Sequence, residues 1–361
     1  MKIASIVGAR PNFIKLAPVS RELRRRGLEE VIIHTGQHYN YEMDKIFFDD
    51  MGIPAPDYHM GIGSGSHGFQ TGEMLKKVEE ALVAEKPDAI IVFGDTNSTL
   101  AGSLAAAKLH IKSAHVEAGL RSFDKSMPEE INRVLVDHCS DLLLCPTKTA
   151  VDNLRREGIT ENVYLTGDVM VDAQKDCERI AENKSHILED LMQKPKDYYL
   201  ATVHRASNTD NPDNLRAITE AFQDLENVVF PCHPRAEKYL REFGLWDDLI
   251  RKIKVIKPVG YLDMLLLEKN AKKIITDSGG VQKEAYLLGI ACITLRDETE
   301  WVETVEDGWN VLVGPNKEKI ISLARCFEPG HKRQDVFGNG DASVKIIDLV
   351  ENILQEESGG S

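Results

Sequence analysis

Residues 274–285 read IITDSGGVQKEA, an apolar run that passes through Ser278, Gly279 and Gly280 into a helical pattern. This order predicts a strand, a glycine turn and a helix. Glycines let a ligand approach the backbone closely, and the free amides and dipole of a helix start favour an anion such as phosphate. A plain capped turn, in which Ser278 only caps the helix, uses the same residues. The segment by itself leaves both interpretations open.

The same alternation of strand and helix patterns extends over the whole chain. Apolar runs typical of strands lie at residues 2–7, 30–35, 89–93, 113–116, 142–146, 163–165, 199–202, 228–232, 253–256, 273–276, 291–295 and 310–313. Helical patterns lie between them at 13–25, 72–85, 97–109, 129–139, 214–224, 261–270 and 281–288. Short, fully apolar strands that alternate with helices predict an α/β fold whose parallel sheets are covered on both faces.

We predict two Rossmann-like domains that face a cleft, because 361 residues suit about two domains. The N-terminal domain is placed at residues 1–167 and the C-terminal domain at 168–341. The last helix, about 342–355, is expected to pack back on the N-terminal domain. Residues 168–196 read as polar and helical, with a break at 194–197. In such sheets ligands bind at the carboxyl ends of the strands.

Charge and composition exclude several classes of function. Lys and Arg total 44 and Asp and Glu total 58, so the net charge is −14 and a nucleic acid is an unfavourable partner. No apolar run approaches the roughly 18 residues of a membrane span, so we expect no membrane partner. The six cysteines form no Cys-x-x-Cys pair, so we expect no zinc site and reduced thiols in a cytoplasmic protein.

In the first half, charged side chains follow the strands. Arg10 and Lys15 bring two cations to the helix start after strand 2–7, which is unfavourable unless an anion binds there. The Gly-x-Gly-x-x-Gly fingerprint of dinucleotide binding is missing. Asp95 and Glu117 come directly after strands 89–93 and 113–116, where a carboxylate is costly unless it is paired or used. A helix cap explains Asp95 equally well.

In the second half, two strand ends carry an imidazole beside a guanidinium. His204 and Arg205 follow strand 199–202, and His233 and Arg235 follow strand 228–232. Cations and helix starts at strand ends suit a diphosphate, and carboxylates with an imidazole suit acid–base chemistry. No covalent-nucleophile or P-loop pattern is present. The acids of residues 296–303, RDETEWVE, are equally consistent with a solvated loop.

Taken together, these segments resemble the non-hydrolysing UDP-N-acetylglucosamine 2-epimerase family. The matching motifs are GARPNFIKLAP, HTGQHY, GDTNSTLAG, HVEAGLRS, MPEEINR, VHRASN, HPR, PVGYL, TDSGGVQKEA and RDETEW, in order between residues 8 and 301. The resemblance implies a glycosyltransferase B-type fold, a homodimer, and no cofactor or metal. It also implies interconversion of UDP-GlcNAc and UDP-ManNAc for surface polysaccharide precursors, by elimination of UDP to a 2-acetamidoglucal and re-addition.

The resemblance also implies roles for individual residues. The positions that match the family's catalytic groups are Asp95, Glu117, Glu129 and His204, with Glu130 as a possible substitute for Glu129. Arg10 and Lys15 match active-site cations, Ser278, Gly279 and Gly280 match a pyrophosphate cradle, and Glu284 matches a ribose-binding carboxylate. We add Arg205, His233, Arg235 and Arg296 as further candidates for substrate binding.

Three departures leave the substrate open. Residues 8–12 read GARPN, 167–169 read GDV and 299–303 read TEWVE, where common members read GTRPE, GNT and TERPE. These versions are similar to the subgroup that acts on UDP-2,3-diacetamido-2,3-dideoxyglucuronate, whose carboxylate Arg296, Arg235 or Lys283 would bind. The allosteric Gln-His-Arg segment of some members reads Gln37-His38-Tyr39 here. A hydrolysing 2-epimerase, a glycosyltransferase of the same fold and a nucleotide-sugar-binding regulator are the other hypotheses.

Overall fold

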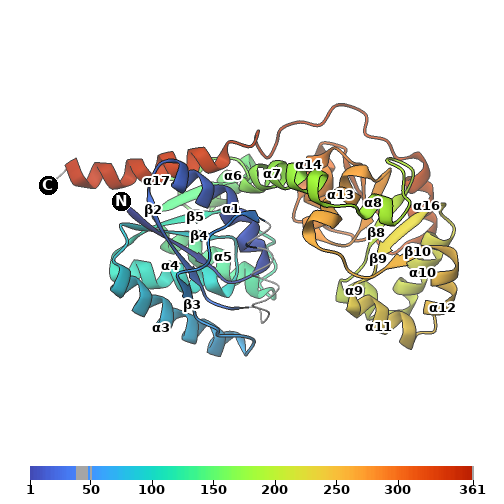
Figure 1. Ribbon diagram of the computed structural model, residues 1–361, viewed down its shortest axis with the longest axis horizontal. Helices are drawn as coiled ribbons and strands as arrows, with labels where there is room; N and C mark the ends of the chain where they lie inside the picture. Colours follow the sequence, from blue (N-terminus) through green and yellow to red (C-terminus); the bar gives the residue numbers. More distant parts are fainter. Residues whose placement is uncertain (38–47, 49–50, 360–361) are drawn as a thin grey trace. The chain divides into compact units, whose positions relative to one another are not determined.

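The computed structural model describes residues 1–37, 48 and 51–359, without the side chains of Arg10 and of residues 356–359. Two compact units make up the chain (Figure 1). Unit 1 comprises Met1–Lys175 and Asp335–Ser361, and unit 2 comprises Asp176–Gln334. The division lies within helix α7 (Val169–Lys184), a few residues after the expected boundary at Gly167.

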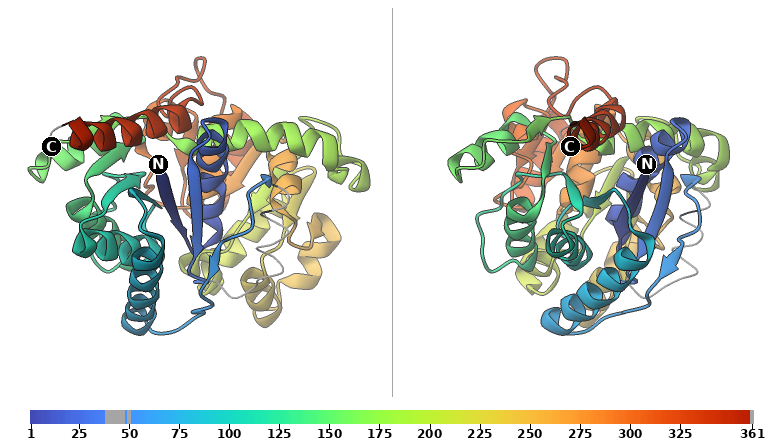
Figure 2. Two further views of the ribbon diagram at one scale, coloured as in Figure 1. Left: turned by 60° about the vertical axis from the view of Figure 1, so that its left-hand side comes forward. Right: turned by 90° about the vertical axis from the view of Figure 1, so that its left-hand side faces the viewer.

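Unit 1 is a seven-stranded parallel sheet with the order β3-β2-β1-β4-β5-β6-β7. The strands are β1 (Lys2–Val7), β2 (Glu29–His34), β3 (Tyr58–His59), β4 (Ala89–Phe93), β5 (Lys112–Val116), β6 (Leu142–Cys145) and β7 (Val163–Leu165). The helices are α1 (Arg10–Arg25), α3 (His67–Glu85), α4 (Asn97–Leu109), α5 (Pro128–Cys139), α6 (Lys148–Arg156) and α17 (Ala342–Gly359). Helices α1 and α17 pack together on one face, and α3 and α4 pack together on the other (Figure 2).

Unit 2 is a six-stranded parallel sheet with the order β10-β9-β8-β11-β12-β13. The strands are β8 (Tyr199–Thr202), β9 (Val228–Pro231), β10 (Lys254–Ile256), β11 (Lys273–Thr276), β12 (Cys292–Thr294) and β13 (Asn310–Leu312). The helices are α8 (Ile187–Asp190), α9 (Ala206–Thr209), α10 (Pro212–Gln223), α11 (Pro234–Glu242), α12 (Trp246–Lys252), α13 (Tyr261–Asn270), α14 (Gly279–Leu288), α15 (Val302–Glu306) and α16 (Lys317–Cys326). The predicted α/β class with parallel sheets is confirmed.

The strand order places the sequence motifs where ligands bind in such sheets. In unit 1 the order reverses between β1 and β4, and in unit 2 it reverses between β8 and β11. A crevice forms at the carboxyl ends of strands at these switch points. The segments after β1, β4, β8 and β11 contain part of the residues singled out from sequence, among them Lys15, Asp95, His204 and Ser278.

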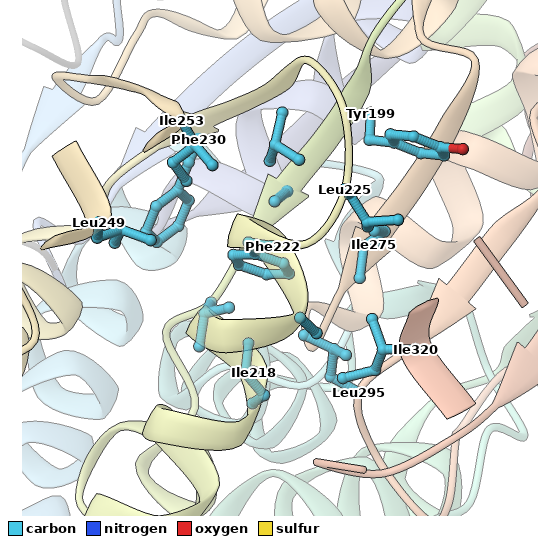
Figure 3. Packing of buried hydrophobic residues seen from close by; sticks show 14 of the residues in the cluster. Tyr199, Ile218, Phe222, Leu225, Phe230, Leu249, Ile253, Ile275, Leu295 and Ile320 are labelled. Carbon is cyan, nitrogen blue, oxygen red and sulfur yellow. The ribbon is translucent and has the colours of Figure 1, made fainter. Parts of the chain in front are cut away.

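A large apolar core supports the switch point of unit 2 (Figure 3). Phe222 of α10 packs edge-on against Phe230 of β9, with ring centroids 5.8 Å apart and planes at 63°. Burying each ring contributes about 1.5–3 kcal/mol, and the aromatic contact adds roughly 0.5–1.5 kcal/mol. Ile275 of β11 belongs to the same cluster. The core thus anchors the strands that carry the site.

The structure departs from prediction in local detail. Strand β3 was missed, because two residues give no detectable periodicity. The polar run at 168–196 forms two helices, α7 and α8, separated near Ser185. Helix α17 continues beyond residue 355 to Gly359. Among the described residues, none of the helices has the length and apolar character needed to cross a bilayer.

Candidate active site

A buried ion pair lies at the centre of the unit 1 switch point. Lys15 of α1 pairs through Nζ with Oε2 of Glu117, and both side chains are only 10% exposed. Gly94, which follows β4 with φ of +66°, lies directly beside them. A Cβ there would stand 3.1 Å from Lys15 Nζ and 3.3 Å from Glu117 Oε2. The cation that looked unfavourable at a helix start is therefore partly neutralised by Glu117.

The backbone of Glu117 is held in an unusual conformation. Its φ is +78°, the left-handed region that costs a residue with a side chain about 1–3 kcal/mol. The N–H groups of Glu117 and Ala118 both donate to the carbonyl oxygen of Leu144, at 3.1 and 3.2 Å. This contact with β6 holds the turn in place. Strain at a chemically useful carboxylate is typical of functional sites.

A buried network that sequence reasoning missed braces the same turn. His115 Nδ1 lies 2.7 Å from Asp137 Oδ1, and Arg121 donates to Asp137 Oδ2 at 2.6 Å. The other ring nitrogen of His115 lies 2.8 Å from the carbonyl oxygen of Gly94. Burial favours a raised pKa at Asp137, but His115 and Arg121 outweigh it and hold the pKa below its usual value. The network therefore connects α5 to the turns at Gly94 and Glu117.

Asp95 and Glu129 line a cavity of about 390 Å³ in unit 1. The cavity is bordered by the first residues of four helices, α1, α3, α4 and α5. Helix starts carry partial positive charge, so their convergence favours an anionic ligand. Arg133 of α5 pairs with the Asp95 carboxylate. Thr96 rather than Asp95 caps α4, so the capping interpretation of Asp95 is wrong.

The structure distinguishes the two adjacent glutamates at the start of α5. Glu130 is buried and accepts from the N–H of Ser122 at 2.8 Å and from the N–H of Phe123 at 2.9 Å. It also pairs with Arg133 at 3.1 Å. Glu129 is exposed and borders the cavity. Glu130 thus fixes the preceding loop, and Glu129 is the carboxylate available to a ligand.

In unit 2, Asp277 anchors the segment that carries His204 and Arg205. Asp277 is fully buried and accepts from the N–H of His204 at 3.0 Å and from the N–H of Arg205 at 3.0 Å. The amide of Asn208 donates to it at 3.0 Å. Asp277 thereby ties the turn after β8 to the end of β11. Asp277 and Asn208 were not among the predicted site residues, although the position of Asp277 directly after a strand was a usable signal.

The second imidazole and guanidinium pair lies beside the first. The rings of His204 and His233 are 5.8 Å apart. Burial, together with His204 and Arg235, lowers the pKa of His233 and favours its neutral form. Arg235 pairs with Asp210, at 2.5 Å from Nη2 to Oδ2, and donates to the Thr209 hydroxyl at 3.0 Å. The Arg235 guanidinium is therefore engaged within unit 2.

The glycine turn before α14 is closely packed. Ser278 caps the helix by accepting from the N–H of Val281 at 3.4 Å. A Cβ on Gly279 would lie 2.0 Å from Glu300 Oε1, so any larger residue there would displace the Glu300 carboxylate. Glu300 in turn lies 2.9 Å from Arg296 and 3.6 Å from Arg205. A carboxylate and two guanidinium groups thus meet at the helix start.

The remaining predicted residues are placed less directly. Gly280 is exposed next to the cap, and Glu284 is buried one turn further along α14. Lys283, a candidate for a substrate carboxylate, lies over the Trp301 ring at 4.1 Å. The side chain of Arg10, and His38 and Tyr39, lie outside the described residues. Within the described part of the chain, no cluster of three or more His, Cys, Asp or Glu side chains is arranged for a metal ion.

Comparison with known proteins identifies the family. A sequence profile of UDP-N-acetylglucosamine 2-epimerase matches residues 21–351. A Methanococcus maripaludis protein named UDP-N-acetylglucosamine 2-epimerase homolog is 59% identical over 98% of this chain and 100% of its own length. The Pseudomonas aeruginosa UDP-2,3-diacetamido-2,3-dideoxy-D-glucuronate 2-epimerase is 45% identical over 98% of this chain and 100% of its own length.

A solved structure has the same fold throughout. The crystal structure of Methanocaldococcus jannaschii UDP-GlcNAc 2-epimerase in complex with UDP-GlcNAc and UDP matches with a TM-score of 0.86 and 49% identity. The match covers 98% of this chain and 100% of that one. By sequence profile, identity over nearly the whole length and fold, the chain belongs to the UDP-N-acetylglucosamine 2-epimerase family.

Proposed function

We propose that this protein is a non-hydrolysing 2-epimerase that interconverts UDP-GlcNAc and UDP-ManNAc. The observation that carries the proposal is the arrangement in unit 1. Glu117 is held beside Lys15, and Asp95 and Glu129 line a cavity at four helix starts. Several carboxylates at an anion-attracting site suit proton transfer at a sugar that carries a diphosphate.

The chemistry follows from these groups. One carboxylate removes the proton on carbon 2 while the bond between carbon 1 and the diphosphate oxygen breaks. The electron pair of the C2–H bond becomes the C1–C2 double bond, and UDP leaves with the electrons of the broken bond. UDP then adds back to carbon 1. A different acidic group delivers a proton to the opposite face of carbon 2. Asp95, Glu117 and Glu129 are the proposed acid–base groups.

Unit 2 supplies the proposed site for UDP. The amides at the start of α14, beside Ser278, Gly279 and Gly280, would bind the diphosphate. Arg205 and Arg296 lie beside Glu300 at this helix start, and their two positive charges exceed its single negative charge, so they would attract an anion. His204, fixed through Asp277, would stabilise the leaving diphosphate. The Glu284 carboxylate would accept hydrogen bonds from the hydroxyl groups of the ribose.

Proton NMR in deuterated water with UDP-GlcNAc tests the proposal. We expect UDP-ManNAc signals with deuterium at carbon 2 and little free UDP. Stoichiometric release of free UDP would instead identify a hydrolysing enzyme, and a requirement for an acceptor would identify a glycosyltransferase. Binding of UDP without any exchange would identify a regulator.

UDP-2,3-diacetamido-2,3-dideoxyglucuronate is the second candidate substrate. The P. aeruginosa enzyme named for it is 45% identical, close to the 49% of the M. jannaschii UDP-GlcNAc 2-epimerase. Arg296 at the α14 start offers a cation for the additional carboxylate. The same NMR assay with this nucleotide sugar distinguishes the two substrates by rate.

A cytoplasmic homodimer is part of the proposal. All six cysteines are free thiols, which is typical of a reducing compartment. On α5, Ile131 and Leu135 are 49% and 46% exposed and, four residues apart, lie on one helix face. A partner surface would cover this apolar face. Light scattering should give twice the mass of the chain, and a monomer would contradict the dimer.

A further inference from the structure

Two carboxyl groups meet in the interface between α13 and α14 of unit 2. Glu268 near the end of α13 is 1% exposed, and Glu284 on the second turn of α14 is 8% exposed. The two carboxyl groups face each other within hydrogen-bonding reach, and the Tyr261 hydroxyl also contacts Glu284. Within the part of the chain that the structure describes, Glu268 forms no ion pair with a Lys, Arg or His side chain. Glu268 takes no part in the proposed chemistry.

This pair is stable only if it holds a proton. Ionised carboxylates accept hydrogen bonds but donate none, and among the described residues no N–H or O–H group donates to either oxygen of Glu268. Burying an unpaired carboxylate is very costly, and a second negative charge beside it adds repulsion. A neutral carboxyl group removes both costs, because its O–H donates to the neighbouring carboxylate.

The proton belongs on Glu268. Burial, followed by the charge of Glu284, raises the pKa of Glu268 well above its usual value. Burial and the charge of Glu284 also raise the pKa of Tyr261, so this phenol keeps its proton beside Glu284. Glu284 is therefore flanked by two neutral O–H groups, one from Glu268 and one from Tyr261. Both groups can orient the same carboxylate.

Further titratable groups lie near the pair. Tyr198, directly before β8, and Cys292 of β12 lie close enough to interact electrostatically with Glu268, and Cys177 of α7 lies near Tyr261. Burial raises the pKa of Tyr198 and raises that of Cys292 to about 12. Tyr198 and Cys292 therefore keep their protons near neutral pH and add no charge beside the two carboxyl groups.

We propose that Glu268 is a positioning residue whose neutral carboxyl group, together with Tyr261, orients the Glu284 carboxylate toward the two hydroxyl groups of a ribose. A carboxylate can accept hydrogen bonds from both hydroxyl groups of a diol at once only when the plane of the carboxylate is held in one orientation. An apolar side chain would fill the same space without burying a polar group, so a carboxyl group here costs stability. The inference rests on the proposed function, because Glu284 meets a ribose only if the ligand is a UDP compound.

The test compares the affinity of the full chain for UDP and for 2′-deoxy-UDP by calorimetry. The readout is the ratio of the two dissociation constants, in which the shared base and diphosphate cancel. We expect the wild type to prefer UDP, Glu268→Met to reduce this preference roughly tenfold, and Glu268→Gln to retain it because its amide still donates. Glu318→Gln, an exposed change on α16, is the matched control and should behave as the wild type.

The pH profile gives a second readout. As the pH rises past the raised pKa, Glu268 loses its proton and repels Glu284, so the wild-type preference for UDP should fall. In Glu268→Gln the preference should stay flat over the same range. If Glu268→Met fails to fold, this comparison decides alone.

Equal ratios in folded Glu268→Met and wild type, or parallel pH profiles of wild type and Glu268→Gln, would overturn the inference. Those results in a protein that still epimerises UDP-GlcNAc would leave the proposed function intact. A wild type that binds neither nucleotide would overturn both proposals.

Discussion

Replacing Asp277 by Asn tests how unit 2 positions His204. The change keeps the size of the side chain but removes its charge and turns one acceptor oxygen into an N–H₂ group. Asp277 receives three N–H donors, from His204, Arg205 and Asn208, each at 3.0 Å. Asn has a carbonyl oxygen at only one of the two positions that the Asp277 oxygens occupy. At least one of the three N–H groups would therefore face the N–H₂ group of Asn in a fully buried site.

The magnitude follows from these contacts. A hydrogen bond to a charged acceptor contributes about 1.5–3 kcal/mol, and a buried donor without an acceptor costs about 1–3 kcal/mol. We therefore expect Asp277→Asn to lower the unfolding free energy of unit 2 by about 3 kcal/mol. For a domain of this size, each kcal/mol shifts Tm by about 2–4 °C, so the melting temperature should fall by roughly 6–12 °C.

Differential scanning calorimetry and the epimerase assay measure the two consequences. The unit 2 transition should move down, and turnover should fall because His204 and Arg205 lose the acceptor that fixes their backbone. Asp248→Asn is the control, since Asp248 is 74% exposed and its Arg251 partner is 3.6 Å away. That change should stay within about 0.5 kcal/mol. A Tm within about 1 °C of wild type, with unchanged turnover, would refute the anchoring role of Asp277.

Three further predictions concern chemistry, backbone and thiols. Glu117→Gln and His204→Ala should each slow turnover about 10²–10⁴-fold with unchanged circular dichroism, and near-normal rates in both would contradict the site assignment. Gly94→Ala places a side chain on a residue with positive φ, beside the ion pair of Lys15 and Glu117. We expect both Tm and turnover to fall. Unchanged values of both would show that the turn tolerates a Cβ. A thiol reagent should label exposed Cys326 first, read by mass spectrometry of the digested protein; early labelling of buried Cys145, whose pKa burial raises to about 12, would contradict the packing of β6.

Local sequence was sufficient for the order of most strands and of the longer helices between them. The mainly apolar run 2–7 and the fully apolar run 89–93 coincide with β1 and β4, because a strand buried on both faces needs few polar residues. The same reasoning located Glu117 and His204 directly after strands. Strand β3 has only two residues, which are too few for an alternating pattern to be detected.

The surroundings of the candidate site residues depend on contacts between residues far apart in the sequence. Lys15 meets Glu117 across 102 positions of the chain, and Asp277 meets His204 across 73. Sequence could not decide between Glu129 and Glu130, because both suit a helix start equally well. The structure places them differently: an amide of the loop at Ser122 donates to Glu130, and Glu129 lines the cavity.

The sequence by itself therefore determined the alternation of strands and helices, the class of the fold and the strand ends at which charge collects. These depend on periodicity and burial within a few residues. The tertiary structure alone decided which charges neutralise each other, and showed that Glu268 and Glu284 share an interface. Such pairings depend on the order of parallel strands, which places side chains far apart in the chain within hydrogen-bonding distance in a medium of low polarity.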